Sequence, residues 1–231
     1  MTNPCAVQDG RYSRQEDIVP ADMIASRKAM VIGVGAIGRQ VALQLASIGV
    51  PRLTLVDNDI IEESNVVTQG YHEKDIDNYK VHVTSDDCYE INTKIEVLAI
   101  TDRYLASENY DCSEIFICVD SIEDREFIFN SITGWDFYCD GRMSAESIRI
   151  LTVPHPFDDE GDEHPDRELY RKTFFAPSEA FEGVCTAKST IYTANIAAGL
   201  MVSQFTKWLR NFSVIQDVSC NVLSMEMGMT V

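Results

Sequence analysis

The sequence predicts an α/β fold with a mostly parallel central sheet, helices on both faces and a mixed C-terminal part. A strand, a helix and a second strand follow one another within about thirty residues, at 28–33, 36–48 and 53–56, which is one βαβ unit. A glycine-rich turn joins the first strand to the helix, and further apolar strands alternate with helical patterns downstream. We expect one domain over residues 1–231.

The first strand is predicted by an apolar run that ends in glycine, and the helix by apolar residues at helical spacing up to Gly49. A helix is expected over 80–92, a strand over 95–100, a buried strand over 114–119 and a helix over 123–133. Strands at 137–140 and 147–153 follow. The segment 154–171, rich in Asp, Glu, Pro and His, predicts an acidic surface loop. The longest helical pattern covers 186–210, and 214–218 and 222–225 are expected as edge strands.

Composition excludes several classes of function. The formal net charge of -18 disfavours nucleic acid and anionic membrane surfaces as partners. No apolar stretch reaches the ~18 residues that span a bilayer, and no secretory signal is visible. Seven cysteines without a Cys-x-x-Cys pair fit a cytoplasmic protein and argue against a structural zinc. In the acidic loop, a solvated surface is favoured over a metal site because the ligand spacing is loose.

A Gly-x-Gly-x-x-Gly motif stands between the first strand and its helix, and predicts a Rossmann-like nucleotide site. Its residues are Gly33, Val34, Gly35, Ala36, Ile37 and Gly38. The glycines allow a tight turn, close approach to a phosphate and close helix packing, while the helix N-terminus attracts the anion. Asp57 ends the next strand, where a carboxylate can bind ribose hydroxyls. The motif alone leaves ATP and NAD both open.

Four further stretches decide between these nucleotides, because in this order and spacing they resemble the ThiF/MoeB and ubiquitin-activating (E1-like) adenylyltransferase superfamily. The stretches are Arg11–Gln15, Asp57–Asp59 with Ser64–Gln69, Tyr79–Val81, and Cys118–Ser121. The resemblance runs from Arg11 to about Val153 and resumes at Gly183. It implies an ATP-binding fold that adenylates the C-terminal glycine carboxylate of a small ubiquitin-like or sulfur-carrier protein.

The resemblance also implies roles for the matched residues, and each role suits the side chain. Lys80 would bring an ammonium to the phosphates. Asp120 would hold Mg²⁺, with Asp59 a weaker candidate. Asn65 and Gln69 would contact ribose and phosphate. Arg14 would reach into the site of a partner subunit, which implies a homodimer.

One position departs from the family pattern, since Thr68 stands where arginine is usual. A hydroxyl cannot replace that charge, and Arg39 or Arg11 would have to compensate. Two alternatives therefore stay open: an active enzyme, and a weak or inactive ATP-binding partner subunit. An NAD-dependent oxidoreductase is less favoured, because the chain after Val153 offers no second catalytic region.

Cys185 is a candidate for thioester formation. The block Gly-Val-Cys-x-Ala before the long helix resembles the enzyme that activates the ubiquitin-fold modifier. A helix start and nearby Lys188 would favour the thiolate, which could then capture the acyl group. The alternative is a buried structural cysteine. Asp140-Gly141-Arg142 is a weaker candidate for guiding the partner's tail.

Overall fold

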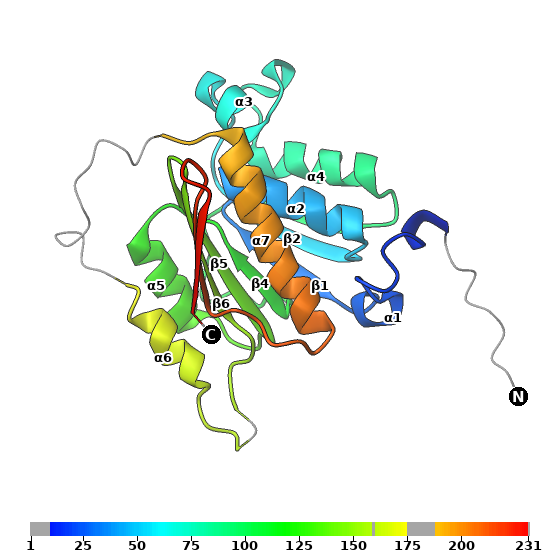
Figure 1. The fold of residues 1–231 in the computed structure, drawn as a ribbon. Helices are drawn as coiled ribbons and strands as arrows, with labels where there is room; N and C mark the ends of the chain where they lie inside the picture. The colour runs from blue at the N-terminus through cyan, green and yellow to red at the C-terminus, as the bar shows by residue number, and fades with distance from the viewer. Residues whose placement is uncertain (1–9, 159, 175–187, 231) are drawn as a thin grey trace, which may run out of the picture.

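The computed structural model describes residues 10–158, 160–174 and 188–230. An eight-stranded sheet in the order β3-β2-β1-β4-β5-β6-β7-β8 forms its centre (Figure 1). The strands are β1 Lys28–Ile32, β2 Arg52–Val56, β3 Glu96–Ile100, β4 Glu114–Ile117, β5 Phe137–Ser144, β6 Ser147–Val153, β7 Asp217–Asn221 and β8 Glu226–Thr230. The helices are α1 Ala21–Ile24, α2 Ala36–Ile48, α3 Glu63–Gln69, α4 Lys80–Ile91, α5 Ile122–Ser131, α6 Pro165–Arg171 and α7 Ile191–Leu209, with 3-10 turns η1 Gly10–Tyr12 and η2 Glu73–Asp75.

The sheet is parallel from β3 to β5 and antiparallel from β5 to β8, which confirms the predicted fold class. Ile32 pairs with Val56 on one side and with Ile117 on the other. The carboxyl ends of β1, β2 and β4 are therefore level at one edge of the sheet. Strand order reverses between β1 and β4, and such a point is where open α/β sheets bind ligands.

Two apolar layers hold the helices to the sheet. On one face α2, α4 and α7 pack over a core that includes Leu45, Phe116 and Phe205. On the other face α5 and α6 cover a smaller core that includes Phe129, Trp135 and Tyr170. Helices on both faces explain why the central strands are apolar almost throughout.

The acidic segment over 154–171 is not a loop throughout, because its last seven residues form α6. Pro165 starts this helix, and the His164 side chain accepts a hydrogen bond from Asp166 N–H at its N-terminus. Tyr170 is buried against the sheet. The expectation was wrong here because composition reflects the exposed charged residues and does not reveal that Asp166 and Tyr170, four residues apart, are buried on one side of a helix.

Other boundaries moved by a few residues. The long helix is described from Ile191, capped by the Thr190 side chain, and the residues before 188 in its predicted range lie outside the described chain. The final strands begin three to four residues later than predicted and form a hairpin. No secondary structure was predicted for the motif Ser64–Gln69, and the structure shows that it lies within helix α3.

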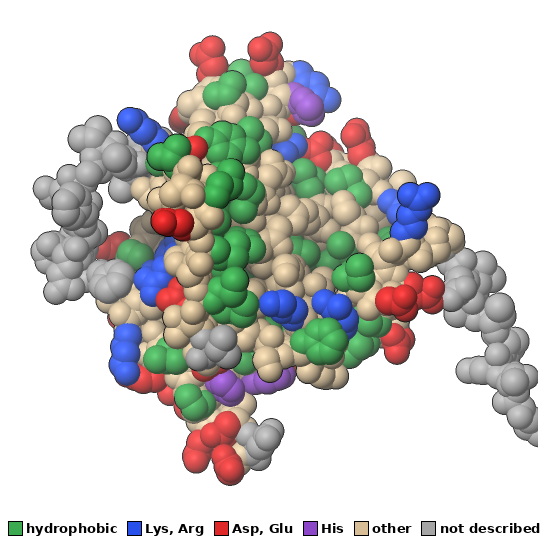
Figure 2. Space-filling view, in the orientation of Figure 1, with side chains coloured by type: hydrophobic (Ala, Val, Ile, Leu, Met, Phe, Trp, Pro, Cys, Tyr) green, Lys and Arg blue, Asp and Glu red, His purple; other side chains and the backbone are tan. Residues whose placement is uncertain are grey.

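The surface is charged but also carries an apolar stripe. Figure 2 shows hydrophobic side chains gathered between α7 and the C-terminal hairpin. Exposed members include Tyr192 and Ile196 on α7 and Met227 and Met229 on β8. Within the described ranges, no helix has both the length and the apolar character needed to cross a bilayer.

Candidate functional site

The three motif glycines have different roles in the turn after β1. Gly33 has φ +86°, and a Cβ there would lie 2.7 Å from the carbonyl oxygen of Cys118. A Cβ on Gly38 would collide with the carbonyl oxygen of Gly33. Around Gly35 the nearest atom to such a Cβ is 3.9 Å away, on the Gln69 side chain. Gly33 and Gly38 therefore shape the turn, and Gly35 leaves open space at the N-terminus of α2.

Asp57 lies beside this turn and is tied to it. Its Oδ2 accepts the Val34 N–H at 2.6 Å, and its Oδ1 accepts the Asp59 N–H at 2.8 Å. Burial raises the pKa of this carboxyl group, and the two backbone hydrogen bonds oppose the rise. A carboxylate offers about four acceptor positions, so two remain for ribose hydroxyls.

Lys80 begins α4 and points at the same edge. Its Nζ lies 2.8 Å from Asp59 Oδ2, and its backbone N–H donates to the Asp59 carbonyl oxygen at 3.0 Å. The Lys80 side chain is only 7% exposed, whereas that of Asp59 is 59% exposed. The structure thus brings together Lys80 and Asp59, which sequence reasoning placed in one site, and shows that they neutralise each other.

Gln69 and Asn65, both on α3, differ in what they can still bind. Asn65 is buried, and its Oδ1 accepts the Glu62 N–H at 3.0 Å, which completes a helix cap. Gln69 Oε1 is buried beside Gly35 and has no hydrogen-bond partner among the described residues. An unpaired buried acceptor next to open backbone is a position that a ligand donor would satisfy. Gln69 fits a binding role, and Asn65 serves the local structure.

Of the two residues expected to compensate for Thr68, Arg39 is engaged elsewhere. The Thr68 hydroxyl donates to the Ser64 carbonyl oxygen at 2.7 Å. Arg39 is buried, pairs with Asp87 at 2.7 Å and lies 4.8 Å above the Tyr71 ring. Arg39 therefore supports the wall of the site, and a second cation is not supplied by it.

Tyr71 is a residue of this site that sequence reasoning missed. Its hydroxyl donates to the Val34 carbonyl oxygen at 2.7 Å and lies 3.1 Å from Thr84 Oγ1. Burial raises the pKa of Tyr71, so the hydroxyl stays protonated and keeps donating. It fixes the glycine turn from below. No motif covers the position, and only the long-range contact identifies it.

Asp120 lies three residues beyond β4 and is exposed at the same edge of the sheet. The next residue, Ser121, caps α5 by accepting the Asp124 N–H at 2.9 Å. The described residues contain no group of three His, Cys, Asp or Glu side chains arranged to hold a metal. Mg²⁺ is commonly held by one or two carboxylates together with substrate phosphates, so an exposed Asp120 beside an open phosphate position fits it.

Arg14 is not part of this arrangement. The stretch around Arg14 packs at the far end of α2, where Gln15 Nε2 donates to the Ile48 carbonyl oxygen at 2.7 Å. A helix of 13 residues is about 20 Å long, so Arg14 lies well beyond its own chain's glycine turn. Cys185 lies outside the described residues, as does the helix start expected around it.

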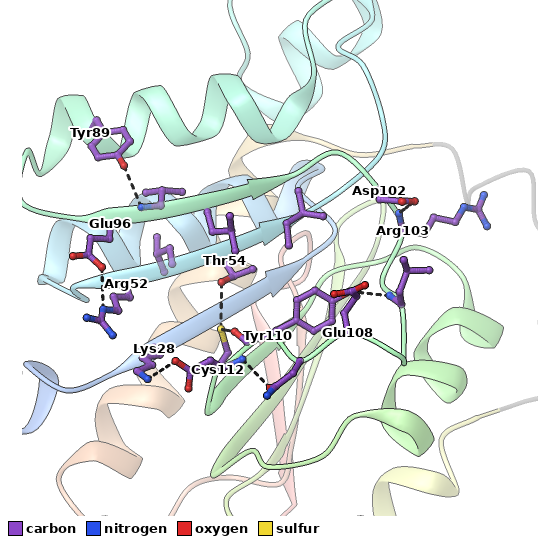
Figure 3. A pocket seen from close by; sticks show the side chains of 17 residues that line it. Lys28, Arg52, Thr54, Tyr89, Glu96, Asp102, Arg103, Glu108, Tyr110 and Cys112 are labelled. Carbon is purple, nitrogen blue, oxygen red and sulfur yellow. Dashed lines mark hydrogen bonds and ion pairs between the residues drawn. The ribbon is translucent and has the colours of Figure 1, made fainter.

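A second hollow lies on another part of the molecule. It has a volume of about 690 Å³ and lies beside β2, β3 and the segment 102–112 (Figure 3). Two ion pairs lie around it, Arg52 with Glu96 at 3.0 Å and Lys28 with Asp111 at 2.6 Å. Gly33, Gly35 and Gly38 do not line this hollow, which is therefore separate from the candidate site.

The sequence model of the ThiF family matches residues 12–227. The chain belongs to this family. Among the relatives of this chain is the mouse (Mus musculus) adenylyltransferase and sulfurtransferase MOCS3, 33% identical over 82% of this chain and 45% of the relative. Another is the Escherichia coli sulfur carrier protein ThiS adenylyltransferase, 30% identical over 51% of each chain. The chain thus spans about half the length of these relatives.

Solved structures agree with this family's fold. Escherichia coli MccB matches with a TM-score of 0.70 and 18% identity, over 97% of this chain and 72% of that chain. The protein PaaA matches with a TM-score of 0.72 and 19% identity, over 98% and 84%. At these identities the likeness establishes the fold of the ThiF-family chain.

Proposed function

We propose that this ThiF-family protein uses ATP·Mg²⁺ to adenylate the C-terminal carboxylate of a small ubiquitin-like or sulfur-carrier protein ending in glycine. The observation that carries the proposal is the open backbone at Gly35 with the unpaired Gln69 acceptor beside it. Lys80 lies near, at the same sheet edge as Asp120. The names of the relatives, which include adenylyltransferases of a sulfur carrier, support the same chemistry.

In this reaction a carboxylate oxygen of the partner attacks the α-phosphorus of ATP. A new C–O–P linkage forms, the bond to the β-phosphate oxygen breaks, and pyrophosphate leaves with the electron pair. The turn at Gly35 and the N-terminus of α2 would receive the phosphates. Lys80 would exchange Asp59 for a phosphate oxygen as its partner, and Asp57 would orient the ribose. Mg²⁺, held by Asp120, would neutralise phosphate charge.

A protein partner suits the surface of this chain. Leu223 and Met225 at the turn of the C-terminal hairpin are 77% and 84% exposed, and hydrophobic side chains also gather between the hairpin and α7 (Figure 2). Exposed apolar surface of this kind is typical of protein contacts. The net charge of -18 would favour a basic partner.

We further propose a cytoplasmic homodimer in which Arg14 acts in the partner subunit's site. The support is the distance between the stretch around Arg14 and the glycine turn of the same chain, which is about the length of α2. Cys185 would take the acyl group from the adenylate as a thioester, with AMP leaving. That step rests on the sequence resemblance alone.

A second candidate function is an ATP-binding subunit with little or no activity. The Thr68 hydroxyl donates a hydrogen bond to the Ser64 carbonyl oxygen, and Arg39 is paired with Asp87. Neither residue therefore adds positive charge at the phosphates. Such a subunit would bind ATP without forming pyrophosphate.

Thermal unfolding with ATP·Mg²⁺, with ATP and chelator, and with NAD tests the first step. A ligand at a hundred times its Kd adds about 2.7 kcal/mol, which moves the midpoint by several degrees. Stabilisation by ATP·Mg²⁺ alone supports the proposal, and stabilisation by NAD alone overturns it. Pyrophosphate release on adding a sulfur-carrier protein ending in glycine, and its loss in Asp120→Ala, then separates the enzyme from the inactive subunit.

A further inference from the structure

A buried ionic cluster lies behind the loop that carries Asp120. The Asp140 side chain is fully buried on β5 and pairs with two arginines, Arg125 from α5 and Arg142 from β5. The Tyr170 hydroxyl of α6 donates to Asp140 Oδ2 at 3.0 Å. The cluster therefore joins α5, β5 and α6 in the interior, and it was not identified as a unit from the sequence.

Arg125 extends from this cluster to the Asp120 loop. Its Nη2 donates to the carbonyl oxygen of Val119, the residue directly before Asp120, and to that of Gly141 at 3.3 Å. The Arg125 side chain is 5% exposed, and it lies in the first turn of α5. One guanidinium thus fastens the backbone beside Asp120 to the neighbouring strand.

Arg142 shares Asp140 but contacts different groups. Its Nε lies 2.7 Å from Asp140 Oδ2, and its Nη1 and Nη2 donate to the carbonyl oxygen and hydroxyl of Thr173 at 3.0 and 2.8 Å. No hydrogen bond within the described ranges joins Arg142 to the loop 118–121. The two arginines therefore share one buried carboxylate, but only Arg125 contacts the Asp120 loop.

Burying two guanidinium groups against one carboxylate leaves one excess positive charge in the interior, which is costly. Burial and the nearby Arg142 lower the pKa of Arg125 to about 10, so it remains charged at neutral pH. A leucine of similar volume would avoid that cost but could not donate to Val119. We infer that the value of Arg125 lies in its hydrogen bond to the Val119 carbonyl oxygen, which offsets the cost of burying the charge.

We propose that Arg125 is a positioning residue that sets the place of Asp120 for the metal–nucleotide complex, through its hydrogen bond to the Val119 carbonyl. This inference rests on the proposed function, because it needs ATP·Mg²⁺ to bind at Asp120. Groups behind a metal ligand typically contribute 10- to 100-fold to metal affinity.

The test measures the Mg²⁺ concentration at which ATP-dependent thermal stabilisation is half complete. Arg125→Lys keeps the charge but loses the planar fork, and we expect a rise of roughly tenfold in that concentration. Arg142→Lys is the matched control, since it perturbs the same carboxylate without touching Val119. It should lower the midpoint of unfolding in chelator but leave the half-saturating Mg²⁺ concentration unchanged.

A double variant shows whether Arg125 acts through Asp120. In an Asp120→Asn background, Arg125→Lys should raise the half-saturating Mg²⁺ concentration no further. Equal shifts in both backgrounds, or equal shifts in Arg125→Lys and Arg142→Lys, overturn the inference. Absence of ATP·Mg²⁺ stabilisation in the wild type would instead overturn the proposed function itself. Should Arg125→Lys not fold, Arg125→Gln takes its place, because it leaves Asp140 and Arg142 as a neutral pair.

Discussion

Lys80 and Asp59 form an ion pair of 2.8 Å in which one member is buried and the other is largely exposed. Removing Asp59 leaves a buried ammonium without its partner, whereas removing Lys80 leaves an exposed carboxylate that water can solvate. Substitution of Asp59 should therefore lower the stability of the fold, whereas substitution of Lys80 should weaken ATP binding with little effect on stability.

We expect Asp59→Ala to lose about 1–3 kcal/mol of folding free energy without ligand, since a buried charged donor is left unpaired. ATP·Mg²⁺ should restore most of it, because a phosphate oxygen can pair with Lys80. Lys80→Met should fold at close to wild-type stability and lose the ATP response. Urea unfolding with and without ATP·Mg²⁺ measures both, and an ATP response retained in Lys80→Met would exclude Lys80 from the phosphate site.

The glycines of the turn give a second prediction. Gly38→Ala should lose more than about 3 kcal/mol, because its Cβ collides with the Gly33 carbonyl in a packed region. Gly35→Ala should lose at most about 1 kcal/mol and yet bind ATP at least tenfold more weakly, since its methyl group enters the space for phosphate. Calorimetric titration with ATP·Mg²⁺ checks this. Equal ATP affinity in Gly35→Ala would place the phosphates elsewhere.

A pH dependence follows from Asp57, whose pKa is raised by burial above the ordinary 3.8. An acid with a raised folded-state pKa stabilises the fold most when it is protonated, and that contribution is lost as pH rises through the folded pKa. The wild type should therefore lose stability relative to Asp57→Asn as pH rises from the ordinary pKa of 3.8 through the raised folded pKa. Urea unfolding of both proteins across this range tests the sign. A constant difference, or one that grows in favour of the wild type, contradicts it.

Local sequence patterns predict the candidate residues that follow or begin a strand or helix, but they do not reveal residues that meet only through long-range contacts. The patterns that predict β1 and β2 place Gly33 and Asp57 directly after a strand, and Lys80 begins a predicted helix. Because these strands are parallel, their carboxyl ends lie at one edge of the sheet. The Arg125–Asp140 pair has no such signal, because the two residues lie on different elements and meet only after packing. Asn65 has the right motif but spends its side chain on a helix cap.

The proposed thioester on Cys185 gives a further prediction. If its thiolate takes the acyl group, Cys185→Ala should leave pyrophosphate release intact and abolish a reducible adduct with the carrier protein. Cys88→Ala is the matched control and should leave the adduct in place. Burial raises the pKa of the Cys88 thiol to about 12, so little of it is present as the nucleophilic thiolate. Gel mobility with and without thiol reductant reads the adduct. An adduct that survives in Cys185→Ala would assign the step to another cysteine.

Arg14 supports a test by subunit mixing. Because the stretch around Arg14 packs at the far end of α2, about 20 Å from the glycine turn of the same chain, we expect Arg14 to act in a site on another chain. Arg14→Ala and Asp120→Ala should each be inactive alone. In a random mixture half of the dimers combine the two variants, and each has one site with Asp120 and a partner's Arg14, so about a quarter of the wild-type pyrophosphate release should return. A mixture that stays inactive while the variants exchange subunits would remove Arg14 from the site.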